Sequence, residues 1–292
     1  MYELRKNYRQ EDTLRKSFNE LAKTTFGLEF EDWYQNGYWT DCYNPYSIVI
    51  DHKVVSNISV NTMEFLYQGE HKTYIQLGTV MTDKQYRNQG LTKIIMQAIE
   101  HDYKEKVDGF YLFANDSVLD YYPKFGYRKA IEYQYSKVLS NELGSKPICK
   151  QAKQIPMDGK KSWLLLEKTI DRSVSNSAFD MIHNKGLIMF YVTQFMQNDV
   201  YYVEEQDAYV IAEIKEEELF IHSTFSNKVV DIDNLVRAFG DINKVVLGFT
   251  PITRKGYVME ELREENTTLF VQGRGFDLYD EKGIRFPSLS HA

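Results

Sequence analysis

The sequence is poor in cysteine, in long apolar runs and in clustered positive charge, and each shortage excludes a class of protein. Only Cys42 and Cys149 occur in 292 residues, too few for a disulfide framework, so we expect a protein of the reducing cytoplasm. The longest apolar runs, at 163–166 and 187–192, fall far short of the ~20 residues that span a membrane. Residues 1–10 are polar and charged, unlike a secretion signal. These absences predict a soluble protein with no membrane partner.

Charge is spread rather than concentrated. Lys and Arg are scattered along the chain, and the formal net charge is -7. Because phosphate backbones are bound by concentrated positive charge, we predict no nucleic-acid partner. An acidic surface attracts amines weakly at long range. The six His residues are far apart in sequence and lack the spacing of metal ligands, so we predict no metal site.

Composition and length predict a folded chain of two domains. Apolar residues make up 43% and charged residues 26%, which is usual for globular proteins. A length of 292 residues exceeds the usual size of one domain. The segment 141–161 is rich in polar residues, Pro and Gly, so we place a linker there. The predicted domains are 1–145 and 146–292.

The first half alternates helical and strand patterns. Apolar stripes at helical spacing alternate with runs in which every second residue is apolar, and this order is typical of a mixed, mostly antiparallel sheet flanked by helices, an α/β fold. The expected helices are 11–23, 29–34, 91–104 and 118–122, and the expected strands are 47–50, 54–63, 73–81, 110–114 and 127–139.

The second half repeats this order in outline. A run of strands, one helix and a further apolar strand follow one another as they do between residues 48 and 114, although the residues themselves do not match. We interpret this as a tandem duplication of one fold. The expected helices are 177–184 and 232–239, and the expected strands are 187–193, 200–204, 209–214, 219–225 and 244–249.

One loop has the composition of an anion site. Arg87, Gly90 and Thr92 lie between an alternating strand and an apolar-striped helix. The first N–H groups of a helix have no internal partner and carry the positive end of its dipole. A glycine lets phosphate oxygens approach the backbone, and an arginine adds a charged donor. In isolation these residues also fit an ordinary turn.

The surroundings of this loop resemble the GNAT superfamily of N-acetyltransferases. Residues 80–92 look like the acyl-CoA loop of that family, Gln/Arg-x-x-Gly-x-Gly/Ala, and residues 122–127 look like its Tyr-x-x-x-Gly-Phe/Tyr element. The resemblance covers roughly residues 1–139, with both motifs in the expected order. Thr92 departs from the pattern, because the family usually has Gly or Ala there. Its side chain could crowd a pyrophosphate or donate a hydrogen bond to it.

The resemblance implies acetyl-CoA as co-substrate, bound between strands that separate near Thr82 and Ala114. Backbone groups of Val80 and Thr82 would hold the pantetheine arm, and a main-chain N–H near Val80 would polarise the thioester carbonyl. Asn115 matches a position that contacts the pantetheine amides in relatives, and it also fits a polar strand end. The residues expected to bind the co-substrate are Val80, Met81, Thr82, Arg87, Asn88, Gln89, Gly90, Leu91, Thr92 and Asn115.

Tyr122 matches the family's general acid, which gives a proton to the leaving thiolate. Its alternative is a core ring with a satisfied hydroxyl, and its neighbour Tyr121 also carries a phenol. The family's base has no counterpart, since Tyr74 aligns with it. Glu64 and Glu70 lie nearby in sequence but fit solvated charges, so we name no base.

The acceptor implied by the family is a primary amine on a small molecule or peptide. Six aromatic residues occur in the segment that covers the acceptor site in relatives, and we expect one or two to line the pocket, with Asp41 assisting a cationic amine. They are Trp33, Tyr34, Tyr38, Trp39, Tyr43 and Tyr46.

The second half lacks the loop motif. Its equivalent segment, 226–231, contains no glycine and ends in Asp231, which repels phosphate and suits a helix N-cap. We expect this domain not to bind CoA, and to wall the acceptor site or mediate a homodimer. Two alternatives to the acetyltransferase stay open. One is a non-catalytic CoA-binding or regulatory module, and the other is a tandem acyltransferase fed by aminoacyl-tRNA, which the absence of a basic stripe disfavours.

Overall fold

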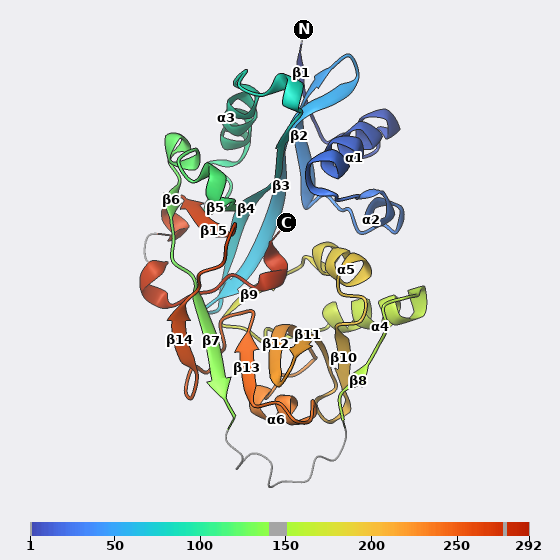
Figure 1. The fold of residues 1–292 in the computed structure, drawn as a ribbon, viewed down its shortest axis with the longest axis vertical. Helices are drawn as coiled ribbons and strands as arrows, with labels where there is room; N and C mark the ends of the chain where they lie inside the picture. The colour runs from blue at the N-terminus through green and yellow to red at the C-terminus, as the bar shows by residue number, and fades with distance from the viewer. Residues whose placement is uncertain (1, 140–150, 277–278, 292) are drawn as a thin grey trace.

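The computed structural model describes residues 2–139, 151–276 and 279–291, which form two mixed sheets with helices on both faces (Figure 1). The first sheet has the order β1-β2-β3-β4-β5-β15-β6, with β9 paired to β3. Its strands are β1 (Glu3–Lys6), β2 (Tyr43–Ile50), β3 (Lys53–Tyr67), β4 (Glu70–Thr82), β5 (Gly109–Ala114), β6 (Arg128–Lys129), β9 (Phe179–Ile182) and β15 (Thr268–Gln272).

The second sheet has the order β14-β7-β13-β12-β11-β10-β8. Parallel pairs join β4 to β5 and β12 to β13, while the other described pairs are antiparallel. The predicted mixed, mostly antiparallel α/β fold is confirmed. The strands are β7 (Tyr133–Val138), β8 (Lys153–Gln154), β10 (Val200–Val203), β11 (Ala208–Lys215), β12 (Glu218–Phe225), β13 (Lys244–Leu247) and β14 (Val258–Glu261).

Helices cover each sheet on two sides. In the first half, α1 (Asp12–Phe26) and α2 (Glu31–Gln35) pack on one face and α3 (Leu91–Tyr103) packs on the other (Figure 1). In the second half, α4 (Lys160–Ile170) and α5 (Lys185–Gln194) lie opposite α6 (Ile232–Arg237). No helix of the described chain is long and apolar enough to cross a lipid bilayer.

The two sheets exchange strands. The strand β7 follows the first-half helices in sequence yet pairs with β13 and β14, and the late strand β15 pairs with β5 and β6. The predicted boundary between residues 145 and 146, like Cys149 and residues 141–150 of the predicted linker, lies outside the described residues. The pairing of the described strands does not divide the chain at that point.

Two predicted elements near residue 185 are wrong. The expected helix 177–184 contains β9, whose Phe179 stacks on Phe65 with ring centroids 4.5 Å apart. The expected strand 187–193 is α5, which Asn184 caps by accepting the N–H of Leu187. This helix is apolar on all sides because it is buried between two cores, so it shows no helical period. The helix α4 was also missed, because its start overlaps the predicted linker.

Candidate active site

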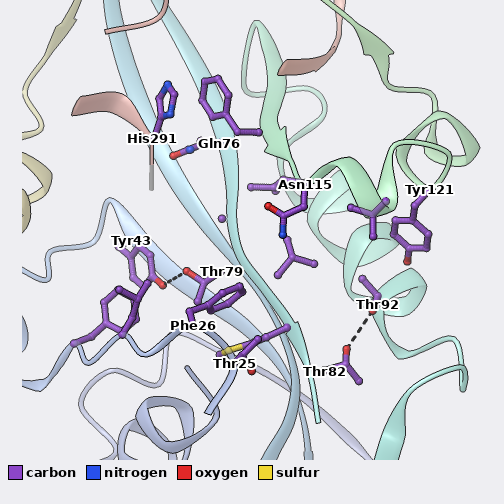
Figure 2. A pocket seen from close by; sticks show the side chains of 18 of the residues that line it. Thr25, Phe26, Tyr43, Gln76, Thr79, Thr82, Thr92, Asn115, Tyr121 and His291 are labelled. Carbon is purple, nitrogen blue, oxygen red and sulfur yellow. Dashed lines mark hydrogen bonds between the residues drawn. The ribbon is translucent and has the colours of Figure 1, made fainter. Parts of the chain in front are cut away.

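A cavity of about 830 Å³ opens where β4 and β5 separate. The two strands pair only over Tyr74–Gln76 and Gly109–Tyr111, and the cavity lies beyond that point. All of the residues predicted to bind the co-substrate, together with Tyr122, line it. Figure 2 shows Thr82, Thr92 and Tyr121 at one end, Gln76 and His291 at the other, and Asn115 between them. The predicted strand separation is therefore present, and the role of each residue stays a prediction.

The loop at the start of α3 leaves its backbone donors open. Gly90 is the N-cap at φ 75°, and no side chain of the described residues caps the helix. A Cβ added at Gly90 would meet nothing within 4 Å, so the space beside the Gly90 Cα is open. Asn88 also has a positive φ of 62°. Because these unpaired N–H groups carry the positive helix end, the loop fits a phosphate.

Two side chains border this anion site. The Arg87 side chain is exposed and donates through Nε to the Thr82 carbonyl at 3.2 Å. The Thr92 hydroxyl lies 3.5 Å from the Thr82 hydroxyl, the distance of a weak hydrogen bond (Figure 2). Thr92 therefore directs its hydroxyl toward the end of β4.

A bulge in β4 forms the floor of the cavity. Gly78 pairs with Ser59 and Met81 with Asn57, so Thr79 and Val80 lie opposite a single residue of β3. Thr79 has φ 47°, a strained value for a β-branched residue. Its hydroxyl contacts the Tyr43 hydroxyl at 2.7 Å, and its carbonyl accepts from Asn57 Nδ2 at 2.9 Å. These contacts hold the distortion, which leaves an extra backbone unit without a partner on β3.

Tyr122 places a phenol beside the cavity. Its side chain is 5% exposed, and its hydroxyl makes no hydrogen bond to any residue that the structure describes. Burial, followed by the neighbouring Tyr121, raises the pKa of Tyr122 to about 12. The phenol is therefore protonated at neutral pH and has a free donor, which disfavours the alternative of a core ring with a satisfied hydroxyl.

Two of the six candidate aromatic residues, Trp33 and Tyr43, line the cavity. Asp41 does not: its side chain is 97% exposed and pairs with Arg9 at 2.7 Å. The carboxylates considered near β4 are also outside the cavity. Glu64 contacts His183 at 2.8 Å, and Glu70 pairs with Lys72 at 2.8 Å.

Sequence reasoning missed the inner wall. Gln76 on β4 lines the cavity although it is 1% exposed, and a glutamine within an apolar strand was the available signal. His291 stacks on Phe113 with centroids 3.6 Å apart, and burial lowers its pKa to about 3, so the imidazole is neutral. The helix α5 and the residue that follows it add a second-half wall made of Leu187, Phe190, Tyr191 and Phe195.

Comparison with known proteins agrees with this geometry. Residues 8–130 match a family model described as an acetyltransferase (GNAT) domain. No curated protein matches the sequence.

Solved structures share the fold at low identity. One is a conserved protein of unknown function from Enterococcus faecalis V583, described as a probable N-acyltransferase, with TM-score 0.60, 17% identity, and coverage of 94% of this chain and 74% of that one. A GCN5-related N-acetyltransferase from Kribbella flavida has a TM-score of 0.54 and 14% identity, with coverage of 92% of this chain and 71% of that one. A GCN5-related N-acetyltransferase from Anabaena variabilis ATCC 29413 has a TM-score of 0.56 and 10% identity, with coverage of 92% of this chain and 72% of that one. At these identities the likeness concerns the fold.

Proposed function

We propose, from the match of residues 8–130 to a GNAT acetyltransferase domain model, that this protein moves an acetyl group from acetyl-CoA to a primary amine. The observation that carries the proposal is one cavity that joins an uncapped helix N-terminus, a backbone bulge and a buried phenol with a free hydroxyl. A small molecule or a peptide would supply the amine. The cytoplasm stays our predicted location.

The donor end of the cavity suits a pyrophosphate and a pantetheine arm. The N–H groups that follow Gly90 would bind phosphate oxygens, with Arg87 adding a charged donor from the rim. Backbone groups of Val80 and Thr82, and the Asn115 side chain, would hold the amides of the arm. Acetyl-CoA supplies the activated acyl group, and the chain's own residues orient it.

The chemistry needs no covalent enzyme intermediate. The amine nitrogen attacks the thioester carbon, a C–N bond forms, and the C–S bond breaks. The amine loses one proton and the leaving thiolate gains one, so the products are an amide and a free thiol. A backbone N–H at the Thr79–Val80 bulge would stabilise the oxygen that becomes negative during the attack.

Tyr122 would serve the leaving group. A phenol with a pKa of about 12 remains protonated throughout the physiological range. A free thiol has a pKa of about 8.5, so complete transfer of the proton is uphill, while a hydrogen bond to the developing thiolate is favourable. We therefore assign Tyr122 as the hydrogen-bond donor to the developing thiolate, while the amine releases its proton to water and the thiolate takes its proton from water.

A non-catalytic CoA-binding module is the second candidate. Among the described residues that line the cavity there is no Asp or Glu to act as a base. An amine that enters uncharged, or a relay through water, removes this requirement, and we therefore favour the enzyme.

Thermal unfolding and thiol release test the proposal together. Acetyl-CoA at 100 times its dissociation constant should stabilise the fold by about 2.7 kcal/mol if it binds only the native state. The full chain with acetyl-CoA and a panel of amines should then release free thiol. No thermal shift at millimolar acetyl-CoA would refute the proposal. A shift without thiol release for any amine would favour the binding module.

A further inference from the structure

The acceptor end of the cavity has little charge. Of the described residues that line the cavity, Arg87 is the one whose side chain is charged at neutral pH, and it belongs to the donor end. His291, at the inner end, is kept neutral because burial lowers its pKa to about 3. An ammonium group that enters this part of the cavity loses hydration and meets no carboxylate among these residues. Each additional positive charge on a substrate would repeat that cost.

The walls are instead aromatic. Phe30 and Phe190 stack with centroids 5.3 Å apart and an interplanar angle of 5°, and Trp33 meets Phe190 edge-on at 5.4 Å. At the rim, Phe26 is 42% exposed and Phe195 is 53% exposed, although both line the cavity. A substrate ring would bury these two side chains, and the apolar area removed from water would favour its binding.

One polar side chain remains unpaired among these rings. Gln76 is 1% exposed, and its Oε1 has no hydrogen-bond partner among the described residues. A buried acceptor without a partner costs free energy that a ligand donor recovers. Gln76 lies on β4 three residues before the strained Thr79, so its carboxamide is close in sequence to the bulge that would hold the carbonyl oxygen.

We propose that the acceptor is a monoamine with an aromatic or bulky apolar body, and that Gln76 fixes its nitrogen by accepting one N–H. This inference rests on the acetyltransferase function proposed above. The rings from α1, α2 and α5 hold the body of the substrate, and Gln76 aims the nitrogen at the thioester carbon. Polyamines are poor substrates because their second charge has no partner on the described wall.

A matched set of amines tests this substrate class. The full chain is assayed by thiol release with 2-phenylethylamine, ethylamine and 1,4-diaminobutane. Burial of a ring corresponds to about 10- to 100-fold, so kcat/KM should be at least about 10-fold higher for 2-phenylethylamine than for ethylamine. The ratio of kcat/KM for 2-phenylethylamine to kcat/KM for 1,4-diaminobutane should be larger still. Equal or better turnover of the diamine would overturn the inference and leave the acetyltransferase intact, whereas no turnover of any amine would overturn both.

Three variants separate the contribution of the polar Gln76 side chain from that of the aromatic wall. Gln76→Leu keeps the volume and removes the acceptor, and it should lower kcat/KM for 2-phenylethylamine about 10-fold or more while acetyl-CoA affinity is unchanged. Gln76→Glu should shift the preference toward the diamine. Phe195→Ala alters an exposed ring and keeps the fold, so it should raise KM for 2-phenylethylamine with little change for ethylamine. Unchanged kinetics in both Gln76→Leu and Phe195→Ala would contradict the assignment.

Discussion

The two sheets contain the same local unit, and only one copy has the features of an anion site. In the first sheet β4, α3 and β5 follow one another, and the two strands pair in parallel. In the second sheet β12, α6 and β13 do the same, with Glu218–Ile221 parallel to Lys244–Leu247. The segment before α6, 226–231, is thus the counterpart of the segment before α3, 87–90.

The backbone donors of the two segments differ. Before α3, Gly90 has no side chain, and the first N–H groups are left open. Before α6, Asp231 accepts the N–H of Asn234 at 3.2 Å, and Gln206 accepts the N–H of Asp231 at 2.9 Å. The N–H of Val230 is bound by Asn176 at 2.7 Å. Donors that could reach a phosphate in one copy are therefore bonded to the protein itself in the other.

Topology thus positions a helix end without deciding whether that end binds a ligand. A capped helix is more stable by about 1 kcal/mol, and an uncapped one retains its positive potential for a ligand. The order of residues alone shows this difference, because Gly90 precedes the first helix and Asp231 precedes the second. Substitutions in the two units should therefore have unequal effects on binding, catalysis and stability.

The largest effect should come from the phenol of Tyr122, which follows β5 in the first unit. Tyr122→Phe removes the donor to sulfur and keeps the ring, so kcat should fall by about 100-fold or more with acetyl-CoA affinity nearly unchanged. Steady-state kinetics and a titration of acetyl-CoA measure the two quantities. Tyr121→Phe is the matched control and should leave kcat nearly unchanged. An equal loss of kcat in both variants would contradict the assignment of the donor role to Tyr122.

Gly90→Asp should convert the first loop toward the second. The added carboxylate repels phosphate at the helix end, so the dissociation constant for acetyl-CoA should rise about 100-fold. Gly90→Asn is the control, because asparagine also tolerates the positive φ of 75° at this position and adds no charge. If both variants weaken binding equally, bulk rather than charge governs the site.

Glu132 lies in the crossing between β6 and β7 that joins the two sheets, and it should make stability depend on pH. Its carboxylate accepts the N–H of Phe286 at 2.9 Å, and burial raises its pKa to about 7. Between about pH 4.5 and 7 the folded state holds a proton that the unfolded state has released, so the free energy of unfolding falls as pH rises through this window.

Glu132→Gln imitates the protonated form at every pH. The variant should match the parent near pH 4.5 and exceed its free energy of unfolding by on the order of 3 kcal/mol at pH 8. Urea unfolding at both pH values measures the difference. A variant that is less stable at pH 8 would mean that the charged carboxylate stabilises the crossing.

The smallest effect is expected at the second helix. Asp231→Gly removes the cap of α6 and should lower the free energy of unfolding by a few tenths to about 1 kcal/mol. It should not create a CoA site, since Gln206 and Asn176 still occupy the neighbouring N–H groups. Binding of acetyl-CoA at a second site in this variant would show that the cap alone prevents it.

The sequence predicted the strand, loop and helix at one end of the cavity, because their signals are local. The stripe of α3, the glycine before it and the alternation of β4 are each set by a few neighbouring residues. The acceptor side depends on tertiary structure. The helix α5 reaches the cavity only because the two halves pack together. Its apolar run, residues 187–192, has no period that distinguishes a buried helix from a strand.

The strand exchange and the bulge were equally invisible. Nothing local in β7 or β15 indicates which sheet each will join, since both are short strands that pair with distant partners. The positive φ of Thr79 is unfavourable for its own residue type and persists because Tyr43 and Asn57 hold it. Such strain cannot be inferred from propensity.

Titration calorimetry of the full chain with acetyl-CoA decides whether one of the two related units, and not the other, binds the co-substrate. We predict a single site for each chain, weakened about 100-fold in Gly90→Asp and unchanged in Asp231→Gly. No binding, two sites for each chain, or one site of unchanged affinity in Gly90→Asp would contradict this assignment.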